Sequence, residues 1–353
     1  MNQTDHKILF SDARSLSTIE DESIHLVVTS PPYPMIEMWD ELYKELNPEI
    51  AGLLENGDGN AAFELMHREL DKVWKELFRV TKPGGFVCIN IGDATRSLKD
   101  RFRMYSNHAR TISYCIELGF DNLPLILWRK QTNAPNKFMG SGVLPAGAYV
   151  TLEHEHILIF RKDGKRAFNS QEEKYNRKES CFFWEERNVW FSDTWDFKGT
   201  KQDIHQDIEG RKRSAAYPFE LAHRLVNMYS VKGDTVLDPF LGMGTTTFAA
   251  MGLGRNSIGV EIEESFKKIL IKDNFGYLVT WLNQHSQNRL NKHDIFVKKR
   301  EGEKGPLKHK NEFYGFPVVS GQESEMYLNP LLSISCDTER NEIAVDYKDE
   351  KIK

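Results

Sequence analysis

The sequence predicts an α/β fold in which a doubly wound, mostly parallel sheet of seven strands is covered by helices. Short apolar runs of strand length alternate with amphipathic stretches of helix length, which is typical of parallel sheets. Two loops with unusual chemistry each follow a predicted strand directly, as ligand-binding loops do in such sheets. The strands are expected at residues 7–10, 24–29, 86–91, 123–128, 156–160, 235–237 and 257–261.

Two amphipathic helices are the clearest of those between the strands. The first is predicted from Asn60 to Val80, and the run Lys82-Pro-Gly-Gly85 is expected to stop it. A second helix is predicted to begin at Pro218, because proline is tolerated in the first turn. The first helix presents Phe63, Met66, Leu70, Val73, Trp74 and Leu77 on its apolar face, and the second Leu221, Leu225, Val226 and Tyr229.

The composition is that of a folded protein in a reducing compartment. The chain has 353 residues, 40% hydrophobic and 28% charged, enough for one large core or for a core with a smaller lobe. No uncharged apolar run of about 18 residues and no secretion signal occur, so we expect a cytoplasmic protein without a membrane segment. No Cys-x-x-Cys pair that would suggest a zinc site or a disulfide framework is formed by Cys88, Cys115, Cys181 and Cys336.

Positive charge is concentrated in two segments. The formal net charge of −5 weakly disfavours a nucleic-acid partner. Residues 161–213, however, contain 13 basic and 11 acidic residues and end in Arg211, Lys212 and Arg213, and residues 289–310 contain 8 basic and 3 acidic residues. A protein that contacts phosphates with one face shows such a distribution, but two solvated surface runs do so as well.

The most specific motif is Asp238-Pro-Phe-Leu-Gly-Met-Gly-Thr-Thr246, between a predicted strand and a helix. Gly242 and Gly244 allow the backbone to approach a ligand closely, and the following helix offers free N–H groups. Glu261 ends the next strand, where a carboxylate can accept both hydroxyls of a ribose. An adenosyl cofactor fits this arrangement. A dinucleotide fits less well, because Thr247 stands where the third glycine of G-x-G-x-x-G belongs.

The second motif is Thr29-Ser-Pro-Pro-Tyr33, directly after the predicted strand 24–29. Two consecutive prolines lack N–H groups and hold an extended backbone, so the carbonyls of Ser30 and Pro31 are expected to point outward as acceptors. As an isolated tetrapeptide, Ser-Pro-Pro-Tyr would suit any loop. If its strand neighbours the strand 235–237, the two motifs meet at one sheet edge.

Together these motifs resemble the β group of DNA amino-methyltransferases, in which the catalytic motif precedes the cofactor motif. The resemblance covers about residues 8–282 and implies a circularly permuted S-adenosylmethionine-dependent methyltransferase fold with a small target-recognition lobe. It implies that Asp12 lies near the adenine and Phe219 near the methionine end of the cofactor, although the segment before Phe219 departs from the family's usual H-P-x-x-F pattern. The other implied S-adenosylmethionine contacts are Asp238, Pro239, Phe240, Gly242, Gly244, Thr245, Thr246 and Glu261.

The resemblance also implies the chemistry. Ser30, Pro31, Pro32 and Tyr33 match the family's catalytic tetrapeptide. A tetrapeptide that begins with serine resembles that of cytosine-N4 methylators. One that begins with Asp or Asn usually marks adenine-N6 methylators, which remain the alternative. We therefore expect transfer to the N4 amine of a cytosine flipped out of double-stranded DNA. The Ser30 Oγ and the Pro31 carbonyl would accept the amine hydrogens, and Tyr33 would stack on the base.

Several residues outside the motifs have two interpretations. Trp128 is either a second wall of the base pocket or a core residue, and Asp93 is expected to cap a helix. Glu153-His-Glu-His156 suggests metal ligands, but alternation on a half-exposed strand explains it as well, and we expect no metal. The basic run Arg211 to Arg213 is a candidate for DNA contacts.

The chain is expected to divide into a catalytic half (residues 1–160, with an insert at 35–60), a target-recognition region with its own aromatic cluster (161–213), a cofactor-binding half (214–284) and a charged extension (285–353). The end of that extension, from residue 311, suits a disordered tail. A cognate restriction endonuclease and a monomer or weak dimer are family-level expectations. A nicotinamide oxidoreductase and a non-catalytic DNA-binding module remain as other classes of function.

Overall fold

The computed structural model describes residues 2–130, 143–198, 217–271 and 275–348. At its centre is a ten-stranded sheet in the order β13-β14-β1-β10-β9-β2-β3-β7-β6-β8. The strands are β1 (Gln3–Phe10), β2 (Ile24–Thr29), β3 (Thr81–Ile91), β6 (Asp121–Arg129), β7 (His154–Arg161), β8 (Thr194–Asp196), β9 (Thr235–Asp238), β10 (Asn256–Glu261), β13 (Leu331–Asp337) and β14 (Glu342–Tyr347).

The five strands β1, β10, β9, β2 and β3 run parallel to one another, whereas β7 is antiparallel to both its neighbours. The α/β, mostly parallel class is therefore confirmed, and all seven predicted strands are present. The expected number of strands in the sheet is wrong, because β8, β13 and β14 extend it at its two edges. β14 does alternate buried Ile343, Val345 and Tyr347 with less buried residues, but the charged composition around it suggested a tail, and β8 is only three residues long.

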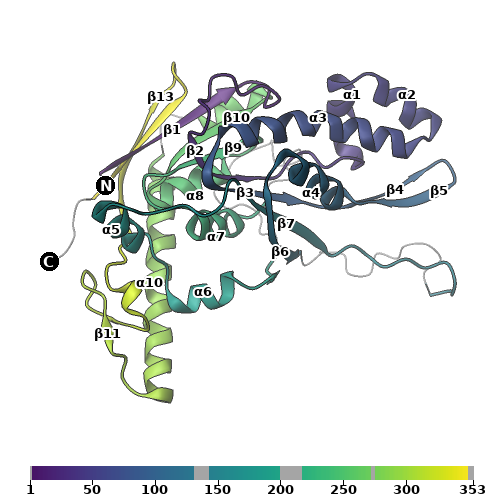
Figure 1. The fold of residues 1–353 in the computed structure, drawn as a ribbon. Coiled ribbons are helices and arrows are strands. Elements are labelled where there is room, and N and C mark those ends of the chain that lie inside the picture. Colours follow the sequence, from purple (N-terminus) through teal and green to yellow (C-terminus); the bar gives the residue numbers. More distant parts are fainter. Residues whose placement is uncertain (1, 131–142, 199–216, 272–274, 349–353) are drawn as a thin grey trace.

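Helices cover both faces of the sheet (Figure 1). One face packs on α3 (Gly59–Val80) and α4 (Asn107–Leu118), and the insert helices α1 (Asp40–Leu46) and α2 (Glu49–Asn56) pack against α3. The other face packs on α7 (Phe219–Tyr229), α8 (Thr245–Leu253) and α10 (Gly276–Lys304). Alternation along each strand explains the two layers: Leu158 and Phe160 of β7 face the first, and Ile157 and Ile159 face the second.

The predicted helix of residues 60–80 is confirmed, but its expected stop signal is not what ends it. The chain becomes extended at Thr81, whose hydroxyl donates to the Leu77 carbonyl (2.6 Å). Residues 82–85 belong to β3, where the Gly84 N–H donates to the Lys162 carbonyl (2.6 Å). Gly84 has a φ of +79° and a Cβ there would meet Arg166, so this turn-like run serves close pairing within the sheet.

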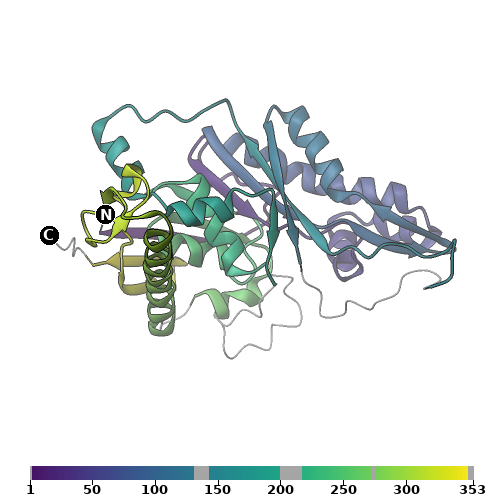
Figure 2. The same ribbon diagram turned by 90° about the horizontal axis from the view of Figure 1, so that it is seen from below.

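Residues 311–348 do not form the expected disordered tail. β14 pairs antiparallel with β1. Ile343, Val345 and Tyr347 are buried in the apolar cluster on the α7, α8 and α10 face of the sheet, which we call the main core. The expected boundary at 284/285 falls inside α10. Short elements between α10 and β13, namely β11 (His309–Lys310), β12 (Pro317–Val318) and a 3₁₀ turn (Gly321–Glu323), lie at this end of the molecule, and α1 and α2 lie at the other (Figure 2).

Within 161–198, Phe182 packs against Trp190 and Phe191, which is part of the expected aromatic cluster, but other aromatic contacts of this region are made with the rest of the fold. Phe183 stacks on His293 of α10, Trp190 contacts His223 of α7, and Trp195 belongs to the main core. The elements of this region, α5 (Gln171–Glu179), α6 (Trp184–Trp190) and β8, are thus docked on the same layer as the cofactor-binding half. None of the helices in the described residues combines the length and apolar composition that a bilayer span requires.

Candidate active site

Four parallel strands end side by side and place the predicted site residues in one row. Along the order β1-β10-β9-β2, their carboxyl ends carry Asp12, Glu261, Asp238 and Ser30. β2 pairs directly with β9, with Leu26 beside Val236 and Val27 beside Leu237. The two motifs therefore do meet at one sheet edge, as ligand-binding loops of doubly wound folds do.

Asp238 joins the two motifs through its buried carboxylate. Its Oδ1 accepts a hydrogen bond from the Thr29 hydroxyl (2.6 Å) and from the Phe240 N–H (3.1 Å). Its Oδ2 accepts from the hydroxyls of Tyr217 (3.1 Å) and Thr246 (2.8 Å). Burial raises the pKa of Asp238, and these donors oppose the rise. Asp238 thus holds the start of the cofactor loop against the catalytic loop.

The loop from Asp238 to Thr246 leaves space that suits a ligand. Gly242 has a φ of +51°, and a Cβ on it would meet nothing closer than the Phe240 carbonyl oxygen at 4.0 Å. Gly244, at φ +82°, caps α8. The Glu261 carboxylate accepts from the N–H groups of Gly242 (2.8 Å) and Glu263 (2.9 Å), which fixes its orientation. An open glycine turn beside an oriented carboxylate fits an adenosyl group with its ribose.

A second polar centre surrounds the catalytic tetrapeptide, and we call Ser30, Tyr33, Asn90, Lys130 and Glu155 the Tyr33 network. The Tyr33 hydroxyl lies 3.1 Å from the Ser30 Oγ and donates to Glu155 Oε2 (2.9 Å). Asn90 Nδ2 donates to the Tyr33 hydroxyl (2.8 Å) and to Glu155 Oε2 (2.7 Å). The Lys130 ammonium donates to Glu155 Oε1 (2.6 Å). Burial, and then the Glu155 charge, raise the pKa of Tyr33 well above its usual value, so the phenol stays protonated.

The proline pair is held from the insert and from α4. Pro31 is buried, and the Pro32 carbonyl accepts a hydrogen bond from the Tyr43 hydroxyl of α1 (2.7 Å). The Asn107 amide donates to the carbonyls of Pro34 (3.1 Å) and Gly92 (2.9 Å). The insert and α4 therefore brace the catalytic loop.

Other predicted residues lie less directly at this edge. Phe219 is buried and packs edge-on against Trp281 of α10, at a ring distance of 4.6 Å. Trp128 is 1% exposed and donates its indole N–H to the Phe197 carbonyl (3.0 Å), so the structure supports its interpretation as a core residue. Asp12 pairs with Arg14 (2.7 Å) beside the end of β10. Arg211, Lys212 and Arg213 lie outside the described residues.

Five residues that contact the two motifs or belong to the Tyr33 network were missed in the sequence: Tyr43, Asn90, Lys130, Glu155 and Tyr217. Glu155 lies in the segment Glu153-His-Glu-His156, where Glu153 and His154 are part-exposed or exposed, as expected of a half-exposed strand, but Glu155 and His156 are buried. The expected alternation does hold, because Glu155 faces the Tyr33 network and His156 faces α4. The sequence carries no local signal for the role of Glu155, because its surroundings are made by Tyr33 and Asn90, which lie far away along the chain.

Comparison with known proteins identifies the family. A family model described as DNA methylase, of the N6/N4 type, matches residues 24–272. The chain belongs to this DNA methylase family. It is 52% identical over 329 residues to the type II methyltransferase M.MthZI of Methanothermobacter thermautotrophicus, a match that covers 92% of this chain and 90% of that protein. It is also 52% identical over 278 residues to M.MjaI of Methanocaldococcus jannaschii, covering 76% and 90%.

Among solved structures, the DNA methylase resembles TTHA0409 of Thermus thermophilus, whose crystal structure holds S-adenosyl-L-methionine. The TM-score is 0.57 at 35% identity, over 75% of this chain and 92% of that one. The DNA methylase accordingly uses S-adenosylmethionine and acts on DNA, as the resemblance implied. A nicotinamide oxidoreductase is thereby excluded. The base that receives the methyl group is a separate question.

Proposed function

We propose that this DNA methylase transfers a methyl group to the exocyclic N4 amine of cytosine in double-stranded DNA. The observation that carries the proposal is the position of Ser30. Its hydroxyl lies in the loop after β2, beside the cofactor loop that follows β9, and 3.1 Å from the Tyr33 hydroxyl. A hydroxyl in this position suits an amine that must lose its conjugation with the ring before it can react.

The amine is a poor nucleophile because its lone pair is delocalised into the base. The Ser30 Oγ and the Pro31 carbonyl would accept its two hydrogens, which draws the nitrogen towards a tetrahedral shape and frees the lone pair. S-adenosylmethionine supplies an electrophilic methyl group on its sulfonium. Holding the amine at a fixed place on the sheet edge accounts for most of the acceleration, since alignment of two reactants in a water-poor site is worth several kcal/mol.

The Tyr33 network would make the base pocket rigid before the base arrives. Two partners, Asn90 and Glu155, hold the Tyr33 hydroxyl, so the phenol ring has little freedom to rotate. A ring fixed in this way offers a stacking wall for a cytosine flipped out of the duplex. The negative charge of Glu155 also favours the positive charge that builds on the amine during transfer. We therefore assign Glu155 the role of a positioning residue.

The cofactor would lie over the ends of β9 and β10. Glu261 would accept the ribose hydroxyls, Asp12 would lie at the adenine, and the open turn at Gly242 would admit the backbone to close contact. Pro239, Phe240, Gly244, Thr245 and Thr246 would complete the loop, and Phe219 would lie towards the methionine end. Asp238 is fully engaged in four hydrogen bonds, so its part is to shape this loop.

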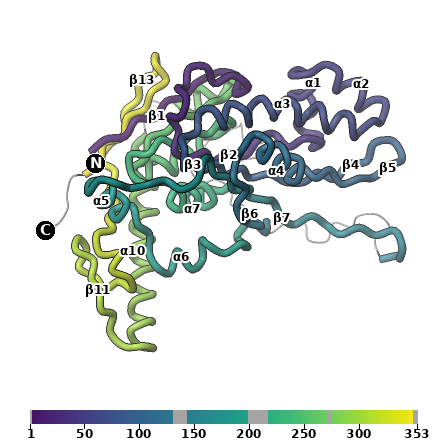
Figure 3. Tube along the Cα trace, viewed as in Figure 1, coloured from purple at the N-terminus to yellow at the C-terminus, as the bar shows by residue number. Residues whose placement is uncertain are grey.

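DNA contacts would come from basic residues at the same edge as the catalytic loop. A two-stranded hairpin, β4 (Ala94–Leu98) and β5 (Arg101–Tyr105), follows the end of β3 and projects beside α1 and α2 (Figure 3). Its Lys99 and Arg101 are exposed. Arg289, in contrast, is buried in an ion pair with Glu186 (2.6 Å), so the segment 289–310 cannot use it to hold DNA. Arg211, Lys212 and Arg213 remain proposed phosphate contacts.

The chain would work as a monomer or weak dimer alongside a restriction endonuclease for the same site.

The proposal is tested with the purified protein, S-adenosylmethionine labelled in its methyl group, and genomic DNA without prior methylation. The DNA is digested to nucleosides and the label is located by chromatography. We expect the label in N4-methylcytosine, and a roughly 10²-fold slower transfer by Ser30→Ala. Ser23→Ala, at the opposite end of β2, is the matched control and should transfer at the normal rate. Label in N6-methyladenine alone would assign the enzyme to the adenine class.

A further inference from the structure

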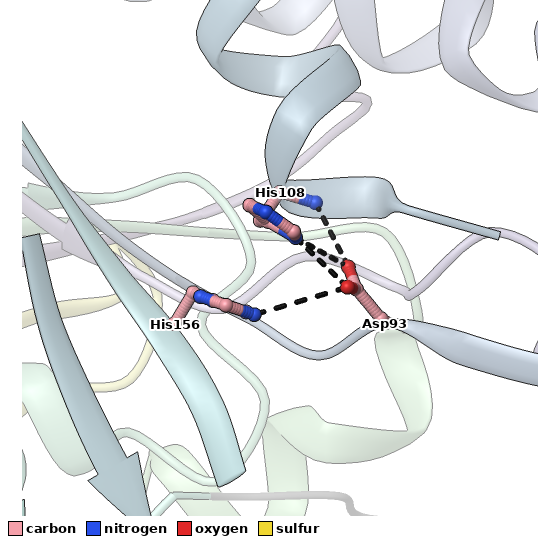
Figure 4. Close-up of side chains that lie close together, drawn as sticks. All are labelled: Asp93, His108 and His156. Atoms are coloured by element: carbon pink, nitrogen blue, oxygen red, sulfur yellow. Dashed lines mark hydrogen bonds and ion pairs between the residues drawn. The ribbon is translucent and has the colours of Figure 1, made fainter. Parts of the chain in front are cut away.

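Three potential metal ligands meet on the α4 side of the sheet, at the end of β3. Asp93 follows β3, His108 lies in the first turn of α4, and His156 lies on β7. Their side chains point towards one another from these three elements (Figure 4). His108 Nδ1 is 2.8 Å from both carboxylate oxygens of Asp93, and His156 Nε2 is 3.8 Å from Asp93 Oδ2.

The three groups are sheltered but reachable. Their side chains are 7% (Asp93), 10% (His156) and 25% (His108) exposed. The two imidazole rings stack at 3.8 Å with an angle of 17° between their planes. Asp93 also accepts a hydrogen bond from the backbone N–H of His108 (3.2 Å) and so caps α4, as expected. This backbone contact alone does not explain why two histidine side chains lie beside the carboxylate. His156 Nδ1 is buried and has no hydrogen-bond partner among the described residues, and its Nε2 is directed at the carboxylate.

The spacing is close to that of a coordinated ion. Ligand atoms at about 2.0–2.1 Å from a tetrahedral Zn²⁺ lie about 3.3 Å from one another. The two contacts to Asp93 are 2.8 and 3.8 Å, and one donor atom of each residue lies within 4.8 Å of the other two. Shifts of about 1–1.5 Å would therefore bring the three donor atoms into range. Two imidazoles and a carboxylate leave the fourth position open, and exposed His154 lies on the same face of β7, 5.0 Å ring to ring from His156.

We propose that Asp93, His108 and His156 form a site for a divalent transition-metal ion, with Zn²⁺ as the best match for this donor set. The ion would tie α4 and β7 to the end of β3. Both strands lead into the Tyr33 network, because Asn90 lies three residues before Asp93 and Glu155 directly precedes His156. The ion is thus expected to stabilise the Tyr33 network from the α4 side of the sheet, without contacting the reacting amine.

The test uses the full-length protein, freed of metal by a chelator and then dialysed against buffered Zn²⁺ or Co²⁺. We expect one bound ion per chain, a visible Co²⁺ spectrum of tetrahedral nitrogen and oxygen ligation, and a higher midpoint of thermal unfolding. His108→Ala and Asp93→Asn should weaken binding by more than the 10- to 100-fold that the loss of an outer-shell partner costs. His285→Ala is the matched control, since it breaks up a second cluster, Glu220, His223 and His285, and should leave binding unchanged.

Absence of stoichiometric binding by the unaltered protein would overturn the proposal, and this measurement does not depend on how well any variant folds. Equal binding by His108→Ala, or loss of binding in His285→Ala, would also overturn it. In those cases the cluster is a hydrogen-bonded carboxylate and imidazole pair with a stacked ring. Because the readout is metal content, the result stands apart from the question of which base is methylated.

Discussion

The Thr29 hydroxyl donates a 2.6 Å hydrogen bond to the Asp238 carboxylate and so connects the catalytic strand with the cofactor strand. Both residues are buried, and each stands where its strand ends and a functional loop begins. Together with the pairing of β2 with β9, and with the Thr246 hydroxyl that donates to the Val28 carbonyl (3.1 Å), this contact fixes the cofactor loop relative to the catalytic loop.

Replacing Thr29 by valine keeps the shape and removes the donor. We expect a loss of about 1–3 kcal/mol in the free energy of unfolding, because a buried carboxylate loses one of its partners. We also expect weaker S-adenosylmethionine binding and slower transfer, measured by equilibrium dialysis and single-turnover kinetics. Thr111→Val is the matched control: the Thr111 hydroxyl is buried without a partner among the described residues, so its loss should not destabilise the fold. Equal effects of the two changes would contradict the role of this contact.

Replacing Glu155 by glutamine should slow the chemical step. The amide removes the negative charge that holds Tyr33 and Lys130, so the target base would be positioned less accurately. We expect kcat to fall roughly 10- to 100-fold, because a small displacement of a reacting group slows a reaction to this extent. S-adenosylmethionine binding should be unchanged, because Glu155 lies on the far side of β2 and β3 from the cofactor loop. Glu153→Gln serves as the control, because Glu153 directly precedes β7 and its side chain is part-exposed. A change confined to KM would show that Glu155 acts in binding alone.

The stability of the protein should depend on His6 at mildly acidic pH. Burial lowers the pKa of His6 from 6.5 to about 3, and its ring contacts the hydroxyls of Ser257 (2.8 Å) and Thr4 (3.0 Å). Since the folded pKa is depressed, the neutral ring's contribution is complete above pH 6.5 and is lost as pH falls towards 3. In this window His6 should contribute a slope of about 1.4 kcal/mol per pH unit to the free energy of unfolding.

His6→Gln should reduce that slope by the stated amount, as measured by urea denaturation at several pH values. At pH 8, where the imidazole is neutral in both states, the variant provides its own baseline. An unchanged slope between pH 6.5 and 5 would show that His6 takes up a proton in the folded protein.

The strand pair β13 and β14 should be essential for the fold. Ile343 is 1% exposed in the main core, so Ile343→Ala is expected to cost about 2–5 kcal/mol. Leu332, on β13, is 59% exposed, and Leu332→Ala should change the free energy of unfolding by no more than about 0.5 kcal/mol. Truncation after Lys310 should yield an unstable protein, as judged by circular dichroism. A stable truncated protein would contradict the docking of β14 on β1.

The parts of the fold that were predictable are those in which local pattern and tertiary burial agree. The helix 60–80 and the strand 24–29 have strong periodicity, and their bounds are matched within one residue. The motifs at Ser30 and Asp238 could be found because proline and glycine impose particular backbone shapes. β14 and Glu155 could not, since their environment is created by partners far away in sequence: β1 lies more than 300 residues from β14, and Asn90 is 65 residues from Glu155. Asp93, His108 and His156 also meet only through the order of β3, α4 and β7.

The central claim is that Ser30 presents the N4 amine of cytosine for methylation. It is tested most directly by single-molecule kinetic sequencing of DNA from cells that express this gene, compared with cells that express the Ser30→Ala variant. We predict N4-methylcytosine at one fixed position of a short recognition sequence, with the mark absent or sparse in the variant. Modified adenine at every occurrence of that sequence, with unmodified cytosine, would contradict the claim.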